Sequence, residues 1–238
     1  MLHDGKNEQP LSKRSKSKLS YSQWNFKKVC NFYNIDKEED PALSAFPTLK
    51  CKCADLTDKS QKITHKLVKA LKSQYGAIPI GNEASRSLYV SSYLVAISKL
   101  FKNQFIICPE KTISGTNGHG PLDYALVSST GSKVIGAVEV KATDYLQGIA
   151  QNTVQCESIL ANGRKTVLGI ITDSEKWFFL KCFLDDNGNP IFQLSKQLVV
   201  VYGDNDMEVQ MNLNDELERE IRLRQQLKSL FNSETNNE

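Results

Sequence analysis

Residues 120–141, GPLDYALVSSTGSKVIGAVEVK, contain two apolar runs separated by a polar turn that includes Gly131. This pattern predicts a β-hairpin. Asp123 and Glu139 each lie eight residues from Gly131, so a symmetric antiparallel hairpin places them opposite each other. Directly opposed carboxylates repel each other, and folding alone therefore does not favour the pair. A divalent cation between them reverses the sign of the interaction.

Lys141 lies two residues beyond Glu139, so both side chains fall on one face of the strand, while Val138 and Val140 point into the core. Two carboxylates and an ammonium group at one strand end suit a Mg²⁺ site for phosphodiester hydrolysis. The lysine orients or activates a water molecule in such a site. A salt-bridge ladder on a solvated sheet explains the same residue types, and these types alone do not separate the two interpretations.

Residues 82–103 have helical spacing, with Asn82 as a plausible N-cap. Glu83 shares an inward stripe with Val90 and Leu94, so its carboxylate needs a cation, a water-filled cleft or a capping role. Arg86, one turn later, either pairs with Glu83 or contacts a phosphate. The residue pattern leaves these alternatives open.

A second helix is expected from residue 143 to about 160, in which Gln151 and Gln155 lie on one face. They either hold a water or phosphate near the strand end or are ordinary exposed polar residues. Strands are expected at 105–108, 166–172, 176–184 and 191–194, with a glycine-rich loop at 114–121. Some adjacent strands are joined by turns too short for a crossover, which predicts a mixed sheet flanked by helices in an α/β fold.

The ends of the chain differ from its middle. Residues 1–22 are predicted to be a disordered basic tail whose KRSKSK cluster is either a nuclear-import signal or a solvated segment. Residues 23–57 are expected to form a short helix and a linker, and the CKC at 51–53 is a poor zinc candidate because further ligands at suitable spacing are missing. Residues 58–202 are the expected main domain. Residues 203–238 are the expected acidic C-terminal segment, which contains a helix.

Residues 58–72 are predicted to form an amphipathic helix with Lys62, Lys66 and Lys69 on one stripe. Such a face either contacts nucleic-acid phosphates or is simply solvated. The net charge is +3, and no apolar stretch is long enough for a membrane span or a signal-peptide core. The sequence therefore predicts an intracellular protein without a membrane partner, with the nucleus favoured over the cytoplasm.

A helical Glu83, Asp123 at the start of a strand, an E-x-K at 139–141 and a glutamine-bearing helix occur in the order of the PD-(D/E)XK nuclease superfamily. More narrowly, NEASRSLYV at 82–90, GPLDYALV at 120–127, VEVKATDYLQGIAQNTVQ at 138–155 and the later KWFFLKC resemble the nuclease domains of Crinkler-type effector proteins. The resemblance covers roughly residues 59–202. It implies a three-layer α/β/α restriction-endonuclease-like core with a mixed central sheet and with helical extensions at both ends.

The same resemblance implies the roles of the site residues. Mg²⁺, with Mn²⁺ as a substitute, is bound by Asp123, Glu139 and the backbone carbonyl of Val140, with Glu83 assisting. Lys141 is the catalytic lysine, and Gln155 with Gln151 are the polar residues of the following helix. Pro121 stands two positions before Asp123, which departs from the family pattern, and no G-x-x-x-x-G-K-[ST] motif of an accompanying nucleotide-hydrolysing module occurs.

The sequence therefore predicts a metal-dependent endonuclease that acts on DNA, with RNA not excluded, and that contacts phosphates through Lys62, Lys66, Lys69 and Arg86. Paired cuts on duplex DNA would imply a homodimer. One alternative is a catalytically silent nucleic-acid-binding or host-interaction protein that keeps the fold. Another is a module that binds a partner through its acidic C-terminal helix.

Overall fold

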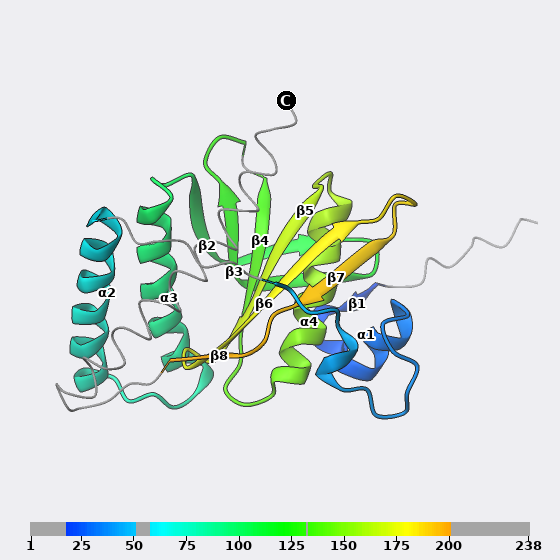
Figure 1. Ribbon diagram of the computed structural model, residues 1–238, viewed down its shortest axis with the longest axis horizontal. Helices are drawn as coiled ribbons and strands as arrows, with labels where there is room; N and C mark the ends of the chain where they lie inside the picture. Colours follow the sequence, from blue (N-terminus) through cyan, green and yellow to red (C-terminus); the bar gives the residue numbers. More distant parts are fainter. Residues whose placement is uncertain (1–17, 51–57, 132, 201–238) are drawn as a thin grey trace, which may run out of the picture.

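The computed structural model describes residues 18–50, 58–131 and 133–200, which form a mixed β-sheet with four α-helices (Figure 1). The helices are α1 (Phe26–Phe32), α2 (Asp58–Ala77), α3 (Glu83–Leu100) and α4 (Tyr145–Ala161). The strands are β1 (Leu19–Ser20), β2 (Phe105–Ser114), β3 (Gly118–Ser128), β4 (Val134–Val140), β5 (Thr166–Thr172), β6 (Lys176–Leu184), β7 (Pro190–Leu194) and β8 (Leu198–Val199).

The sheet has the strand order β1-β3-β4-β5-β6-β7, and in addition β2 pairs with β3 and β8 with β6. The β4–β5 and β1–β3 pairs are parallel, and the others are antiparallel. The parallel neighbours β4 and β5 are joined through α4, because a parallel pair needs a long crossover connection. Short turns join β3 to β4 and β5 to β6. The predicted mixed sheet is confirmed.

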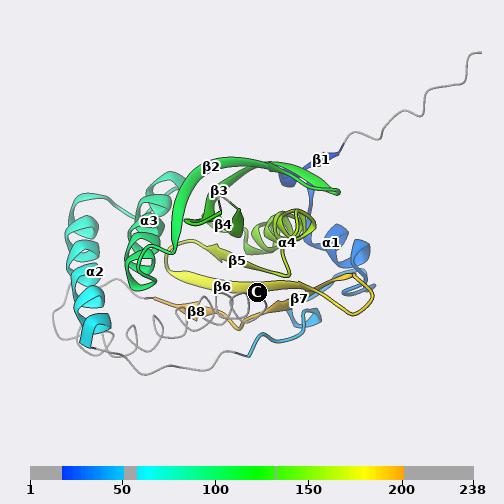
Figure 2. The ribbon, with the colours of Figure 1, turned by 90° about the horizontal axis from the view of Figure 1, so that it is seen from above.

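Apolar side chains gather in two clusters because successive residues of a strand point to opposite faces of the sheet. Ala137 of β4 belongs to one cluster, which contains residues of α1 and α4, and Val138 belongs to the other, which contains residues of α2 and α3. Figure 2 shows the sheet curving around α4, with α1 beside it and with α2 on the outer side of α3. The curvature encloses α4 so completely that every residue from Gly148 to Leu160 is buried.

The N-terminal segment is part of this core. Leu19 and Ser20 pair with the start of β3, Tyr21 is only 2% exposed, and Trp24 and Phe26 are also buried. The prediction of a disordered tail up to residue 22 is therefore wrong for residues 18–22. The α1 helix likewise packs against α4 instead of standing apart from the main domain.

Two element boundaries differ from their predictions. The glycine-rich segment at 114–121 is mostly strand, because β2 continues to Ser114 and β3 begins at Gly118. The first long helix continues past residue 72 to Ala77. The basic cluster at 13–18, for all but its last residue, the CKC and the acidic C-terminal segment lie outside the described residues. In the described part, no helix is long and apolar enough to cross a membrane.

Candidate active site

The paired carboxylates lie where β3 and β4 separate. The antiparallel register joins Tyr124 to Val138, which makes Asp123 and Glu139 the next opposed pair, as the hairpin pattern predicts. The ladder of paired residues between β3 and β4 ends with Tyr124 and Val138. The backbone N–H of Val140 instead donates to Oδ2 of Asp123 at 2.6 Å. The Asp123 carboxylate therefore accepts a backbone hydrogen bond from β4 in place of a backbone partner, and this bond holds the side chain at the strand end.

Glu139 is almost completely buried, with 3% of its surface exposed. Its Oε2 accepts a hydrogen bond from Nε2 of Gln155 at 2.7 Å, and its Oε1 lies 2.7 Å from Nζ of Lys141. Burial and then the charge of Asp123 raise the pKa of Glu139 to about 7, although Lys141 and Gln155 act to lower it. The two carboxylates therefore interact unfavourably with each other.

Lys141 connects two acidic side chains. Its Nζ lies 2.7 Å from Glu139 and 3.4 Å from Oε1 of Glu83. Burial lowers the pKa of Lys141, but Glu139, Glu83 and Asp123 raise it by more, so the net pKa is raised. Lys141 is consequently a protonated cation and hydrogen-bond donor at neutral pH. It is poorly suited to accept a proton.

Glu83 forms the solvent-facing side of this cluster. Its side chain is 51% exposed, so the prediction that it lies on a buried stripe is wrong. Asn82 is the N-cap of α3, as predicted, because its side chain accepts from the backbone N–H of Ser85 at 3.0 Å. With the capping role filled by Asn82, the carboxylate of Glu83 pairs with Lys141.

The two glutamines are buried, which excludes the interpretation that they are exposed polar residues. Gln155 has no exposed surface, and its amide donates to Glu139. It holds the carboxylate in place and does not reach solvent, contrary to the role of orienting a water or phosphate. Gln151 lies one turn earlier on α4 and is also buried, but the hydrogen bond to Glu139 comes from Gln155.

Glu110 is a neighbour of the acid pair that the sequence analysis missed. The β2–β3 register runs from Pro109 opposite Tyr124 to Lys111 opposite Leu122 without a shift, so Glu110 stands opposite Asp123. Its φ of 50° is unusual for a residue with a side chain. Burial raises the pKa of Asp123, the Val140 N–H and Lys141 lower it, and Glu83 and Glu110 raise it further. The strand expected from the sequence ends at residue 108, whereas β2 continues to Ser114, so the sequence does not place Glu110 opposite Asp123.

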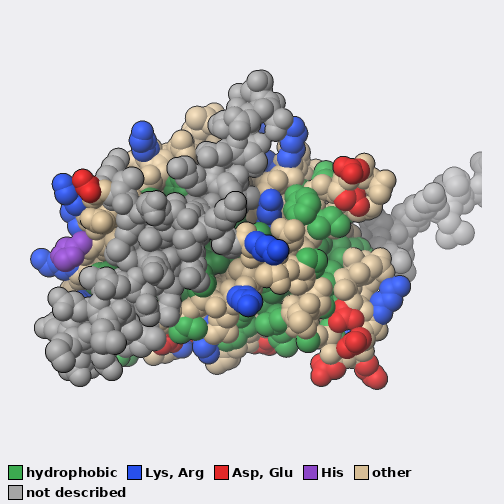
Figure 3. Space-filling model, viewed as in Figure 1, with side chains coloured by type: hydrophobic (Ala, Val, Ile, Leu, Met, Phe, Trp, Pro, Cys, Tyr) green, Lys and Arg blue, Asp and Glu red, His purple; other side chains and the backbone are tan. Residues whose placement is uncertain are grey.

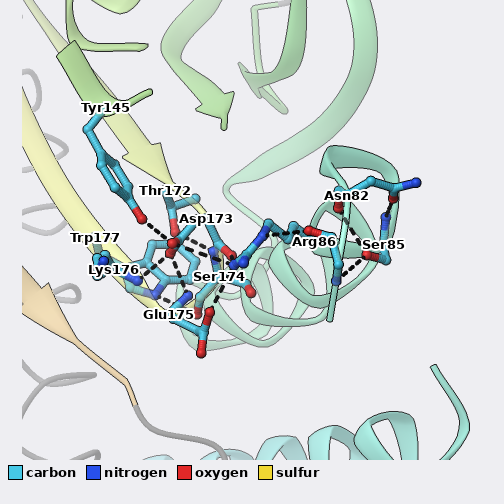
Figure 4. Close-up of polar contacts among 11 residues, drawn as sticks. Asn82, Ser85, Arg86, Tyr145, Thr172, Asp173, Ser174, Glu175, Lys176 and Trp177 are labelled. Atoms are coloured by element: carbon cyan, nitrogen blue, oxygen red, sulfur yellow. Dashed lines mark hydrogen bonds and ion pairs between the residues drawn. The ribbon is translucent and has the colours of Figure 1, made fainter. Parts of the chain in front are cut away.

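Arg86 does not pair with Glu83. Its Nη1 donates to the backbone carbonyl of Asp173 at 2.6 Å and to Oε2 of Glu175 at 2.9 Å, and it lies 3.5 Å from Oδ2 of Asp173 (Figure 4). Its Nε donates to the carbonyl of Gly81. These bonds join the start of α3 to the turn between β5 and β6. Because its charge is already paired, the predicted phosphate contact of Arg86 loses support.

The same turn also contacts the segment after β4. The hydroxyl of Tyr145, at the start of α4, bonds the carboxylate of Asp173 (Figure 4). The backbone N–H of Lys141 donates to the carbonyl of Thr172 at 2.9 Å. The β5–β6 turn therefore ties together the elements that carry Glu83 and Lys141.

Lys62, Lys66 and Lys69 are exposed on α2, as predicted. The α2 helix packs against α3, and Figure 3 shows Lys and Arg side chains along the edge of the molecule where α2 lies in Figure 1. Nothing in the structure tests whether these lysines bind nucleic acid, so that role stays a prediction.

The carboxylates of Asp123 and Glu139 fit Mg²⁺ better than a structural zinc ion. In the described residues, no group of three or more His, Cys, Asp or Glu is arranged to hold a metal ion. The acid pair thus lacks the full set of protein ligands that a structural zinc site needs. It does fit Mg²⁺, which keeps several waters and takes one or two carboxylates together with substrate phosphate oxygens. A cation there would also relieve the repulsion that raises the pKa of Glu139.

The fold and the site therefore define an α/β protein with a mixed sheet, at one strand end of which two carboxylates and a lysine converge. In sequence, the chain is 41% identical over 207 residues to Crinkler effector protein 1 of Rhizophagus irregularis, which covers 81% of this chain and 44% of that protein. It is 33% identical over 117 residues to Crinkler effector protein 5 of Phytophthora infestans, covering 48% of this chain and 33% of that protein. These similarities indicate homology to Crinkler effector proteins.

The chain spans less than half the length of these two relatives. No protein-family model matches it. Among solved structures, the crystal structure of the type IIG restriction endonuclease BpuSI matches with a TM-score of 0.39 and 16% sequence identity, covering 61% of this chain and 17% of that protein.

Proposed function

We propose that this chain is a metal-dependent nuclease domain of the PD-(D/E)XK type, with a three-layer core, that hydrolyses phosphodiester bonds of DNA. The observation that carries the proposal is the convergence of Asp123, Glu139 and Lys141 at the end of β4, with Nζ of Lys141 2.7 Å from Glu139. The homology to Crinkler effector proteins and the order of the four motif elements support it.

In this proposal Asp123, Glu139 and the backbone carbonyl of Val140 hold Mg²⁺, and Glu83 assists. The bound metal would lower the pKa of a water molecule and neutralise charge on the phosphate group. Asp123 is held ready for this role by the Val140 N–H, and Glu139 by Gln155.

Lys141 contributes positive charge. Its pKa is raised, mainly by Glu139 acting against the effect of burial, so it donates hydrogen bonds to a water or to phosphate oxygens. The proposal therefore assigns it the roles of orienting the nucleophile and stabilising developing negative charge. Removal of a proton from water is left to another group.

Plasmid nicking tests the proposal. We expect the wild-type protein to nick supercoiled DNA with Mg²⁺ or Mn²⁺ and not with chelator, and we expect Asp123→Asn and Lys141→Met to slow nicking by about 100-fold or more. Asp123→Asn keeps an oxygen that can accept from Val140 while removing the charge. Asp186→Asn, an exposed position in the β6–β7 turn, is the matched control and should nick at the wild-type rate. A protein that binds DNA but nicks it with no divalent metal would instead be a silent nucleic-acid-binding protein.

The basic face of α2 is tested by binding. Replacing Lys62, Lys66 and Lys69 by alanine should weaken DNA binding and reduce the slope of log K against log[salt] by about 2 to 3, because each lysine that neutralises a phosphate releases counterions. Alanine at the exposed Lys27, Lys165 and Lys196 removes the same charge elsewhere and is the control. Equal affinities and slopes for the two triple variants would remove α2 from the interface.

A further inference from the structure

A chain of buried amides leads away from Glu139 into the core. Gln155 and Asn152 are on the same face of α4, and neither has any exposed surface. Nε2 of Gln155 donates to Oε2 of Glu139 at 2.7 Å, and Nδ2 of Asn152 donates to Oε1 of Gln155 at 3.1 Å. Nδ2 of Asn152 also donates to the backbone carbonyl of Ala137 at 3.2 Å. Ala137 lies on β4, two residues before Glu139.

Only one orientation of the two side-chain amides satisfies all of these hydrogen bonds. A backbone carbonyl accepts and never donates, so the NH₂ group of Asn152 must face Ala137. The second hydrogen of that NH₂ group then meets the oxygen of Gln155, which leaves the NH₂ group of Gln155 to face Glu139. If Gln155 were reversed, its amide oxygen would face the carboxylate and the amide nitrogen would face the NH₂ of Asn152. Both contacts would be repulsive, and burial would make the loss costly.

Two neighbours keep Asn152 in place. The thiol of Cys156 donates to Oδ1 of Asn152, with the sulfur 3.6 Å away. A Cβ on Gly169 of β5 would lie 1.9 Å from the same Oδ1, so glycine at this position makes room for the asparagine side chain. Both β5, through Gly169, and α4, through Cys156, therefore accommodate the side chain of Asn152.

We propose that Asn152 is a positioning residue of the candidate active site, which fixes the orientation of Gln155 and through it the position of the Glu139 carboxylate. The role of Asn152 for Gln155 follows from the hydrogen bonds alone. Its consequence for metal binding and nicking rests on the proposed function. Outer residues that orient a metal ligand typically change metal affinity or activity by about 10- to 100-fold when they are replaced.

The first test uses the wild-type protein and needs no activity. The side-chain NH₂ of Gln155, buried and bonded to Glu139, should exchange its hydrogens with solvent far more slowly than an exposed glutamine amide, as followed by NMR. Rapid exchange in the wild-type protein would overturn the proposal. This measurement remains decisive even if the protein binds no metal and cuts no DNA.

The second test uses Asn152→Asp, which removes the NH₂ group at nearly constant size. We expect loss of Gln155 amide protection, and a loss of Mn²⁺ affinity and of nicking of about 10- to 100-fold. Thr153→Val is the matched control, because Thr153 is equally buried on α4 and its hydroxyl donates to the carbonyl of Ile149 in the same helix. The control should keep Gln155 protection and Mn²⁺ affinity.

A third variant guards against failure to fold. In the double variant Asn152→Ala with Gly169→Ala, the added methyl group occupies space that the asparagine leaves, and the remaining neighbours at 3.0 Å, Cys156 and Leu180, need only a small shift. A folded double variant should also lose Gln155 protection and Mn²⁺ affinity. Retention of both would overturn the proposal. Loss of protection without any metal binding in the wild-type protein would instead contradict the proposed function and leave the role of Asn152 intact.

Discussion

Glu139 is an ionisable side chain in a buried position, held by Gln155 on one oxygen and by Lys141 on the other. Replacement by an apolar residue would remove the cost of burying its charge. The proposed function gives the charge a use, because a metal ligand must be deprotonated. Burial favours the protonated form of Glu139, whereas metal binding needs the ionised form. The raised pKa of Glu139 therefore makes the stability of the protein depend on pH.

In the metal-free protein, this dependence has a definite sign. Burial and Asp123 raise the pKa of Glu139 to about 7 from an ordinary value near 4.5, so its stabilising contribution is full below the ordinary pKa and is lost as the pH rises through about 7. The contribution is on the order of 1 to 3 kcal/mol. We expect Glu139→Gln to lose less stability than the wild-type protein between pH 5 and pH 8, measured by urea unfolding in chelator.

Glu38→Gln, at an exposed carboxylate, is the control for that measurement and should follow the wild-type curve. If Glu139→Gln and the wild-type protein lose stability in parallel over this pH range, Glu139 is ionised in the folded state at its ordinary pKa.

At single positions, the spacing of residues predicts some neighbours and misses others. Asp123 and Glu139 are opposed, as expected, because a hairpin with alternating side chains leaves little freedom in its register. Glu83 pairs with Lys141 of the same cluster, but its side chain is 51% exposed, whereas the helical periodicity placed it on a buried stripe. Glu110 stands opposite Asp123 on a part of β2 that lies beyond the strand expected from the sequence.

Among the helices and strands, α4 is unusual because it is buried on all sides from Gly148 to Leu160. Its sequence, YLQGIAQNTVQCESILA, predicts a helix with polar positions, and the helix is present. Its burial comes from the curved sheet, which packs residues from several strands around it. The hairpin of β2 and β3 approaches α4 closely at two glycines, where a Cβ on Gly115 would lie 2.1 Å from Oγ of Ser158.

The second close approach gives a prediction about this packing. A Cβ on Gly118 would lie 2.5 Å from the ring of Tyr21 and 2.9 Å from Val154, so Gly118→Ala should destabilise the protein by about 1 to 3 kcal/mol through overpacking. Gly131→Ala is the control, because nothing lies within 4 Å of its Cβ position. Thermal unfolding should show a lowered Tm for Gly118→Ala only. Equal Tm values would mean that the N-terminal segment moves away at little cost.

For the whole molecule, the buried residues between 19 and 30 show that the folded domain begins well before residue 58. Tyr21, Trp24, Phe26 and Val29 lie in the same cluster as residues of α4. Full burial of each such side chain contributes about 1.5 to 3 kcal/mol, and their sum is comparable with the stability of an ordinary domain, about 5 to 15 kcal/mol. A domain cut at residue 58, the boundary expected from the sequence, therefore lacks part of its core.

We expect a chain that begins at Asp58 to lose cooperative thermal unfolding and the near-ultraviolet circular dichroism of packed aromatic side chains. A chain that begins at Lys18 keeps every described contact of α1 and is the comparison. If the shorter chain unfolds cooperatively at the same Tm, the N-terminal segment is an accessory to the fold and not part of its core.

By itself, the sequence determined the helices α3 and α4, the β3–β4 hairpin, and the placement of Asp123, Glu139 and Lys141 at one strand end. These features depend on local periodicity and turn chemistry, which neighbouring residues specify. Only the tertiary structure decided that α4 is enclosed, that residues 19–30 complete the core, and that Gln155 and Asn152 lie behind Glu139. The enclosure of α4 and the packing of residues 19–30 depend on the curvature of the sheet and on contacts between residues more than a hundred positions apart, such as Gln147 with Ser22 and Trp24. The bonds from Gln155 to Glu139 and from Asn152 to Ala137 span only 16 and 15 positions, but they form because α4 packs against β4. No local sequence pattern encodes either kind of contact.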